Sequence, residues 1–228
     1  MTTFHDSQLG EIVVRRSARA SAIRIRAGTD GRLVVSAPKL TPLFVIKQTV
    51  RRAQDDLQQL RDQSRTRAYR HGDQIGQSHR LILAPGDALQ ARFGKREVVI
   101  GIPAGTSVDS EPVQSEIRRV VIKLLRKEAK VYLDTRLEVL ASRHGFTYSR
   151  IRYTHAATRW GSCSSQGTIS LNIALMSLPL ELIDYVLIHE LCHTRQMNHS
   201  TAFWEEVARI DPHYKLHRRQ LKTKSPGV

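Results

Sequence analysis

The sequence predicts an α+β fold, in which a β-rich region of about residues 1–105 precedes a largely helical region, 106–228. Two observations support this order of elements. Short runs of β-branched residues, separated by turn residues, fill the first region. A long apolar periodicity of the helical type begins after residue 110. With 228 residues, of which 40% are hydrophobic, the chain can bury a core without a disulfide or a structural metal.

The first β-rich stretch reads as three strands followed by a helix. Residues 11–16, 22–26 and 32–36 are the expected strands, and Thr29-Asp30-Gly31 forms the expected hairpin turn. A helix over about residues 42–66 follows, opened by Pro42. Its apolar positions recur at spacings of three and four, which defines one buried stripe: Ile46, Val50, Ala53, Leu57 and Leu60.

A second β-rich stretch occupies residues 73–102, and no repeat of the first is evident in its sequence. Candidate strands are residues 80–83, 88–93 and 96–102. The small, polar segment 103–110 is the expected boundary between the two regions. A long helix then begins, with Ser110 as N-cap and Pro112 in the first turn, and it ends at Gly145.

The helical region contains two candidate strands, 150–155 and 168–173, which flank a loop of residues 159–167. A helix opened by Pro179 then carries His189-Glu190-Leu191-Cys192-His193. Two histidines at positions i and i+4 lie on one helical face about 6 Å apart, so both can bind a single Zn²⁺. The carboxylate beside the first histidine can take a proton from a metal-bound water. This spacing predicts a zinc-dependent hydrolase.

A catalytic zinc usually has three protein ligands and one open position. We expect His199 to be the third ligand, because it lies where the chain turns from one helix to a second, which Ser200 caps. The alternatives are Glu205 or Glu206 on that second helix, or a site with only two protein ligands. We expect the remaining nearby candidates to lie at the surface: His213 and His217. Cys163 and Cys192 are expected to pack as small apolar side chains.

Several motifs occur together in this part of the chain. They are Arg159-Trp160-Gly161-Ser162-Cys163, Leu171-Asn172, the His189–His193 run, Asn198-His199-Ser200 and Phe203-Trp204. In combination they resemble the YgjP-like predicted metal-dependent hydrolases, relatives of the SprT-like and WLM-domain metallopeptidases. The resemblance implies a minimal zincin fold over residues 106–228, with a small antiparallel sheet above the active-site helix. It also implies zinc bound by His189, His193 and His199, with Glu190 as the general base.

An extended peptide or protein is the expected substrate. We expect residues 168–173 to form an edge strand that pairs with it. Arg159, Trp160 and Asn172 are the candidate substrate-binding residues. Arg159, Tyr153 and Tyr214 all remain open as the group that stabilises the transition state.

The net charge of +15 is compatible with an anionic partner. Two further functions therefore stay open beside a peptidase: hydrolysis of a nucleotide or other phosphoanhydride, and proteolysis of proteins bound to DNA. The excess of basic over acidic residues is spread evenly along the chain. Residues 1–110 contain 18 basic and 10 acidic residues, and residues 111–228 contain 18 basic and 11 acidic residues. The sequence contains no glycine-rich phosphate-binding loop, which weighs against the nucleotide.

The sequence also indicates the cellular compartment in which the protein is expected. Two cysteines are too few for a disulfide framework, and the first ten residues have no apolar stretch typical of a signal peptide. The apolar runs fall short of the ~20 residues that a membrane span requires. We therefore expect a cytoplasmic protein with no membrane partner.

Overall fold

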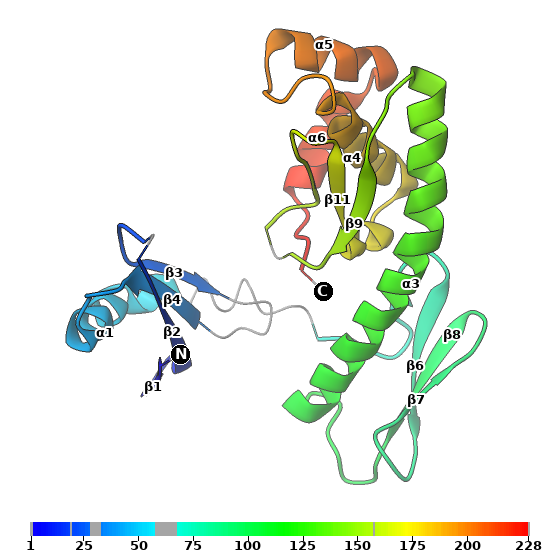
Figure 1. Ribbon diagram of the computed structural model, residues 1–228. Coiled ribbons are helices and arrows are strands. Elements are labelled where there is room, and N and C mark those ends of the chain that lie inside the picture. Colours follow the sequence, from blue (N-terminus) through cyan, green and yellow to red (C-terminus); the bar gives the residue numbers. More distant parts are fainter. Residues whose placement is uncertain (1, 19, 28–32, 58–67, 157, 228) are drawn as a thin grey trace. The chain divides into compact units, whose positions relative to one another are not determined.

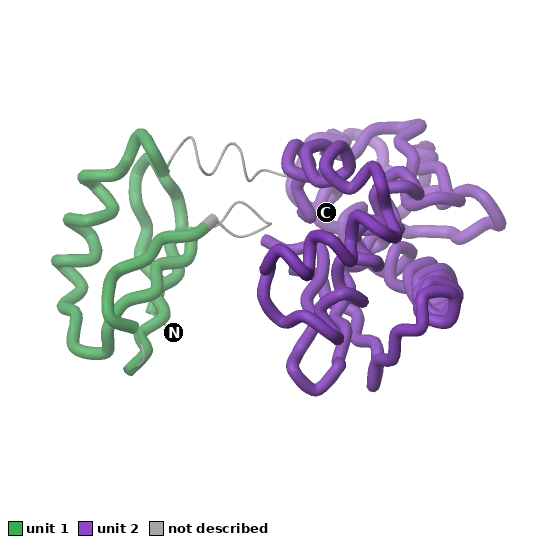
Figure 2. The backbone as a smooth tube through the Cα atoms, turned by 90° about the horizontal axis from the view of Figure 1, so that it is seen from above, with its two compact units in different colours: residues 1–67 green, residues 68–228 purple. Residues whose placement is uncertain are grey.

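A computed structural model describes residues 2–18, 20–27, 33–57, 68–156 and 158–227. The chain divides into two compact units, unit 1 (residues 1–67) and unit 2 (residues 68–228), coloured separately in Figure 2. Each unit has its own hydrophobic core. None of the helices in the described ranges combines the length and apolar character that crossing a membrane requires.

Unit 1 is a four-stranded sheet with one face covered by a helix (Figure 1). Its elements are β1 (Thr2–Asp6), β2 (Gly10–Ser17), β3 (Arg24–Ala27), β4 (Leu33–Pro38) and α1 (Leu43–Arg52). The strand order is β1-β2-β4-β3, in which only the β2–β4 pair is parallel. Alternate residues of β4 are buried against Ile46 and Val50 of α1, as the period of two in a strand requires.

The expected helix over residues 42–66 is interrupted at Ala53. α1 ends at Arg52, residues 54–57 are helical again, and Leu57 is buried in the same core as predicted; residues 58–66 lie outside the described part of the chain. Leu60 lies outside the described residues, as does the expected turn at 29–31. The antiparallel pairing of β3 with β4, which that turn predicted, is present. Strand β1 was not predicted.

The second β-rich stretch repeats the topology of the first. It forms β5 (Gln74–Ile75), β6 (His79–Pro85), β7 (Ala91–Phe93) and β8 (Glu97–Ile102), in the order β5-β6-β8-β7. Again one central pair, β6–β8, is parallel and both outer pairs are antiparallel. We call β1–α1 (residues 2–52) module 1, and β5–β8 with the first half of α3 (residues 74–125) module 2. The repeat lies in the topology, which is why the sequence did not reveal it.

Helix α3 (Glu111–His144) was predicted at both ends. Ser110 is the N-cap residue, Pro112 lies in the first turn, and Gly145 ends the helix in the left-handed conformation, with φ of 67°. Its 34 residues correspond to about 51 Å at the usual helical rise. The helix therefore extends past module 2, and it contacts α4 (Leu180–Cys192) and β9 (Arg150–Thr154).

Residues 68–105 belong to unit 2, whereas we expected the boundary between the regions near residue 105. The reason is packing: Leu81 and Ile100 of the second sheet lie in one continuous core with Ile117 of α3 and Leu187 of α4. The small segment 103–110 is a connection inside unit 2 and not a domain boundary.

A third sheet and four short helices complete unit 2. They are β9, β10 (Gly161–Cys163), β11 (Thr168–Asn172), the 3₁₀ helix η1 (Ile173–Ser177), α4, α5 (Thr201–Ile210) and α6 (Tyr214–Lys222). The α+β class is confirmed, but this sheet is mixed and not wholly antiparallel. β11 pairs antiparallel with β10 and parallel with β9. The expectation that residues 168–173 form an edge strand is wrong, since β11 is central and β10 is an edge.

Candidate metal centre

Three histidines converge on one point beside α4. His189 lies in the last turn of α4, His193 is its C-cap residue, and His199 precedes Ser200, the N-cap of α5. The Nε2 atom of His189 lies 3.2 Å from Nε2 of His193 and 3.1 Å from Nε2 of His199. Within the described residues, these three side chains form the one cluster whose donor atoms could hold a metal ion. The i, i+4 spacing and the turn before Ser200 create this geometry as predicted.

A hydrogen bond fixes the orientation of the middle histidine. His193 Nδ1 lies 2.9 Å from the carbonyl oxygen of Gln196. A carbonyl oxygen only accepts, so Nδ1 carries the proton and Nε2 presents its lone pair to the other two histidines. This is the tautomer that a metal ligand requires.

The pKa values of His189 and His199 are lowered. Removal from water lowers the pKa of His189 to about 3, and the neighbouring His193 and His199 act in the same direction. The pKa of His199 is lowered as well, again mainly by burial. The neutral imidazole is the form that binds metals, so at neutral pH these groups are available as ligands.

Glu190 is buried next to this cluster. Its side chain is 5% exposed, and its Oε2 atom has no hydrogen-bond partner in the described residues. Burial raises the pKa of Glu190 to about 8, while the positive charge of Arg159 lowers it. A cation held by the histidines would act in the same direction as Arg159. An unsatisfied buried carboxyl beside three imidazoles is typical of a site built for chemistry.

Gly161 of β10 makes room for this carboxylate. A Cβ atom at position 161 would lie 2.6 Å from Oε1 of Glu190 and 2.8 Å from its Cγ. The backbone of the edge strand therefore passes directly against the buried carboxyl. Only glycine permits this approach, a constraint that the sequence alone did not show.

Two aromatic residues of α5 support the histidines. Phe203 is fully buried and stacks on His193, with ring centroids 4.5 Å apart. Trp204 stacks on His199 at 5.5 Å. The sequence showed these residues only as part of a family motif, and their contacts with the histidines depend on how α5 packs against α4.

Arg218 of α6 was missed altogether. Its guanidinium lies over Trp204, 4.5 Å from the ring centroid, and its charge contributes to the lowered pKa of His189 and of His199. Arg218 is fourteen residues from Trp204, and no local sequence signal connects them.

The other candidate ligands point elsewhere. Glu206 forms an ion pair with Arg195, with an N–O distance of 2.5 Å, and Glu205 is exposed. His213 is exposed as expected, but His217 is partly buried and lies 2.7 Å from the carboxylate of Asp211.

Both cysteines are free thiols outside the metal cluster. Burial raises the pKa of Cys163 to about 11 and that of Cys192 to about 12. The thiolate form that binds metals is therefore disfavoured at both positions.

Of the three predicted substrate-binding residues, one is fully buried and two are at least partly accessible. Asn172 is fully buried, and its amide donates to the carbonyl groups of Ala156 and Arg159 and accepts from the backbone of Ala174. Because these bonds occupy the side chain, Asn172 shapes the loop and does not reach a substrate. Arg159 is exposed with its charge close to Glu190, and Trp160 is partly buried against the core.

Of the three candidates for stabilising the transition state, Tyr153 is already engaged. Its hydroxyl donates to Asp134 at 2.5 Å, and burial together with this carboxylate raises its pKa. Tyr214 stacks on Trp204, with ring centroids 5.5 Å apart. Arg159 is the one of the three whose charge acts directly on Glu190.

Comparison with known proteins identifies the class of this chain. A family model described as "YgjP-like, metallopeptidase domain" matches residues 21–224, so the chain belongs to the YgjP-like metallopeptidase family. The chain is also similar to a solved structure, the metallopeptidase zymogen abylysin of Pyrococcus abyssi. The identity is 29%, the match covers 40% of this chain and 91% of that chain, and the TM-score is 0.37. The comparison with curated proteins gives no match.

Proposed function

We propose that this protein is a zinc-dependent peptidase in which His189, His193 and His199 bind the metal and Glu190 is the general base. The observation that supports this most strongly is the convergence of three Nε2 atoms next to a buried, unpaired carboxyl group. Membership of a metallopeptidase family supports the metal and the class of reaction.

The donor set fits zinc. Imidazole nitrogens bind Zn²⁺ at about 2.0–2.1 Å, so two of them in a tetrahedral arrangement lie about 3.3 Å apart. The separations of 3.1 and 3.2 Å between Nε2 atoms are close to this value. Three neutral nitrogen ligands leave a fourth position open, as catalytic sites do. When bound, Zn²⁺ would polarise the scissile carbonyl and lower the pKa of a water molecule.

The residues of the chain supply proton transfer. Glu190 takes a proton from the attacking water and delivers it to the leaving amine. Burial raises the pKa of Glu190 and the positive charge of Arg159 lowers it; a cation held by the histidines would lower it further, which favours the carboxylate form that accepts the proton. We propose that Arg159, whose charge already acts on this site, stabilises negative charge developing on the substrate.

An extended peptide fits the edge of the third sheet. β10 is an edge strand of that sheet and passes against Glu190. An added strand would bind through main-chain hydrogen bonds, which gives affinity with little sequence selectivity. We therefore propose unfolded or extended chains as substrates, bound along β10 and not along β11.

The test compares wild type with Glu190→Gln, which keeps the shape of the side chain and removes the base. We expect one zinc per chain in both proteins by elemental analysis, and a loss of casein cleavage of about 10²–10⁴-fold in the variant. Glu205→Gln, an exposed glutamate outside the cluster, is the matched control and keeps full activity.

His189→Ala should lose both metal and activity. Unchanged cleavage by Glu190→Gln, or wild-type protein without zinc after reconstitution, would overturn the proposal. Turnover of nucleoside triphosphates without cleavage of any peptide would replace the peptidase with the phosphoanhydride hydrolase.

A further inference from the structure

The repeated topology provides an internal comparison for one surface of unit 1. In module 1, Ile12 of β2 pairs with Leu33 of β4, and in module 2, Leu81 of β6 pairs with Val98 of β8. Counting along the strands from these pairs assigns each residue of one sheet to its equivalent in the other. The two modules thus share a face that points away from the covering helix, which we call the open face.

Three arginines gather on the open face of module 1. Ser36 of the central strand β4 is paired with Arg15 of β2 on one side and with Arg24 of β3 on the other. Arg26 of β3 pairs with Val34, which lies two residues before Ser36 on the same face of β4. All three arginines are exposed, and none has an ion pair or hydrogen bond within the described part of the chain. Arg24 and Arg26 lie about 7 Å apart along β3.

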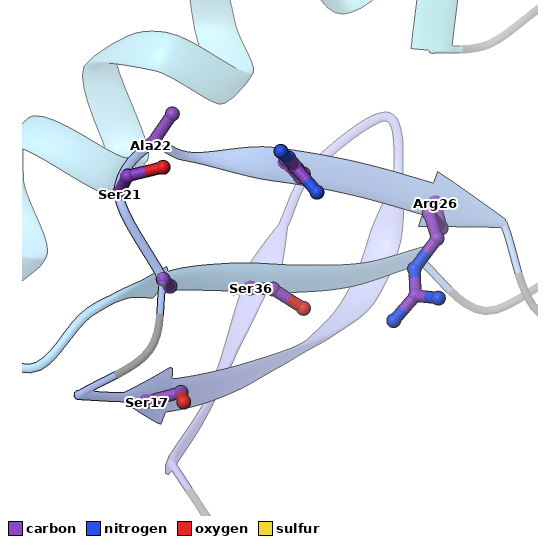
Figure 3. A pocket seen from close by; sticks show the side chains of 7 residues that line it. Ser17, Ser21, Ala22, Arg26 and Ser36 are labelled. Carbon is purple, nitrogen blue, oxygen red and sulfur yellow. The ribbon is translucent and has the colours of Figure 1, made fainter.

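A shallow hollow of about 350 Å³ lies on this face. Arg24, Arg26, Ser17, Ser21 and Ser36 contribute to its lining. Figure 3 shows Arg26 and the hydroxyl groups of Ser17 and Ser36 along the strands that form it. Guanidinium and hydroxyl groups are the donors that bind phosphate oxygens in protein complexes with nucleic acids.

Module 2 has a hollow at the equivalent place, but its lining contains one arginine and one carboxylate in place of two arginines. By the strand pairing, Ala84 takes the place of Arg15, Gln90 that of Arg24, and Gly101 that of Ser36. Arg92 is the equivalent of Arg26, and the acidic Asp87 joins the lining. The topology therefore does not require an arginine at each of these three positions, since module 2 keeps only the equivalent of Arg26, whereas module 1 has all three.

The positive charge of the chain is also distributed unequally between unit 1 and unit 2. Residues 1–67 contain 13 basic and 6 acidic residues, a net charge of +7, and residues 68–228 contain 23 and 15, a net charge of +8. Unit 1 thus holds almost half of the excess in less than a third of the length. A boundary placed near residue 110 conceals this asymmetry.

We propose that the open face of module 1 binds the phosphate backbone of nucleic acid. Phe4 lies on the opposite face of the sheet, in register with the buried Ile12, and the open face carries no phenylalanine, tyrosine or tryptophan among its described strand residues. His5, which pairs with Glu11, is the one aromatic ring among the described strand residues of this face, and with so little surface for stacking, backbone contacts with a duplex are favoured. Glu11, the acidic residue of β2 on this face, is about 13 Å along the strand from Arg15. Binding through this face is therefore electrostatic and independent of sequence.

The experiment uses the full-length, zinc-loaded protein and a fluorescent 20-base-pair DNA duplex, with anisotropy measured from 50 to 200 mM salt. We expect Arg24→Gln/Arg26→Gln to weaken binding at least tenfold and to reduce the slope of log K against log salt by about 2. The matched control is Arg51→Gln/Arg52→Gln, which removes the same charge from exposed positions on α1. This control should bind within twofold of wild type.

The outcomes separate the proposal from its alternatives. If the two double variants lose DNA affinity equally, then net charge and not the open face attracts DNA, and the proposal is overturned. No binding by wild type at 50 mM salt, or binding to phosphatidylserine vesicles in place of DNA, would overturn it as well. Thermal unfolding confirms that both variants fold, and casein cleavage by unit 2 is expected to stay unchanged, since the proposal does not rest on the hydrolase activity.

Discussion

Modules 1 and 2 share one sheet topology but differ in the helix that comes after the sheet. In module 1 the helix α1 has 10 residues and the core is separate from that of unit 2. In module 2 the helix α3 has 34 residues and continues into the part of the chain that holds the histidines. The long helix α3 therefore links module 2 to the part of the chain that holds the candidate metal centre, while the described part of module 1 has a core of its own.

The two modules also differ in the turn between their first two strands. In module 1, Asp6 closes the turn on itself by accepting hydrogen bonds from the backbone of Gln8 and Leu9. In module 2, the equivalent turn is held by other elements: Glu128 of α3 accepts from Gln77 and Ser78. The same backbone topology thus serves as an independent unit in one case and as a contact layer in the other.

Separate cores predict separate unfolding, and this is the largest effect we expect. Leu137→Ala, in the second half of α3, and Ile46→Ala, in α1, each truncate a fully buried side chain and should cost about 2–5 kcal/mol. Hydrogen exchange measured by mass spectrometry should show lost protection in unit 2 for the first variant and in unit 1 for the second. Loss of protection in α4 on Ile46→Ala would show that the two units unfold together.

If the catalytic residues all lie in unit 2, a substitution at Gly161 should lower the cleavage activity and leave the other properties of the protein unchanged. Gly161→Ala places a methyl group against the buried carboxyl of Glu190, which must shift. We expect cleavage of casein to fall about 100-fold, because displacement of a catalytic group by about 1 Å can have this effect. Zinc content and DNA binding should be unchanged. Full activity in this variant would contradict the position assigned to Glu190.

The turn of module 2 should contribute to stability through Gln77. Its side-chain amide donates to the carbonyl oxygens of Met176 and Leu178, at 2.8 and 2.7 Å, and so ties the second sheet to η1. Gln77→Ala leaves these carbonyls without their partner and should cost about 1–3 kcal/mol. Chemical denaturation measures this loss, and the exposed Gln220→Ala serves as control. An unchanged midpoint would show that these two hydrogen bonds do not contribute to the stability of unit 2.

Local chemistry made a large part of the structure predictable. The ends of α3 followed from Pro112 in the first turn and Gly145 after the last, because such residues act within one turn of the chain; Ser110 occupies the N-cap position, but its side chain makes no capping hydrogen bond. The pairing of His189 with His193 followed from the helical repeat. His199 was predicted from a turn and a cap only six residues away. Family membership added the reaction class to residues that had already been selected by spacing.

Only the tertiary structure decided which strands meet and which helices close over the site. β11 became central because β9 and β10 both pair with it, and strand pairing over long distances leaves no short-range sequence pattern. The contacts of Trp204 with His199 and of Gly161 with Glu190 depend on segments brought together by folding. The sequence by itself therefore determined which three histidines converge, which carboxyl group lies beside them, and the limits of the long helix. The duplicated sheets, the division at residue 67 and the surroundings of the metal centre depended on packing between distant segments.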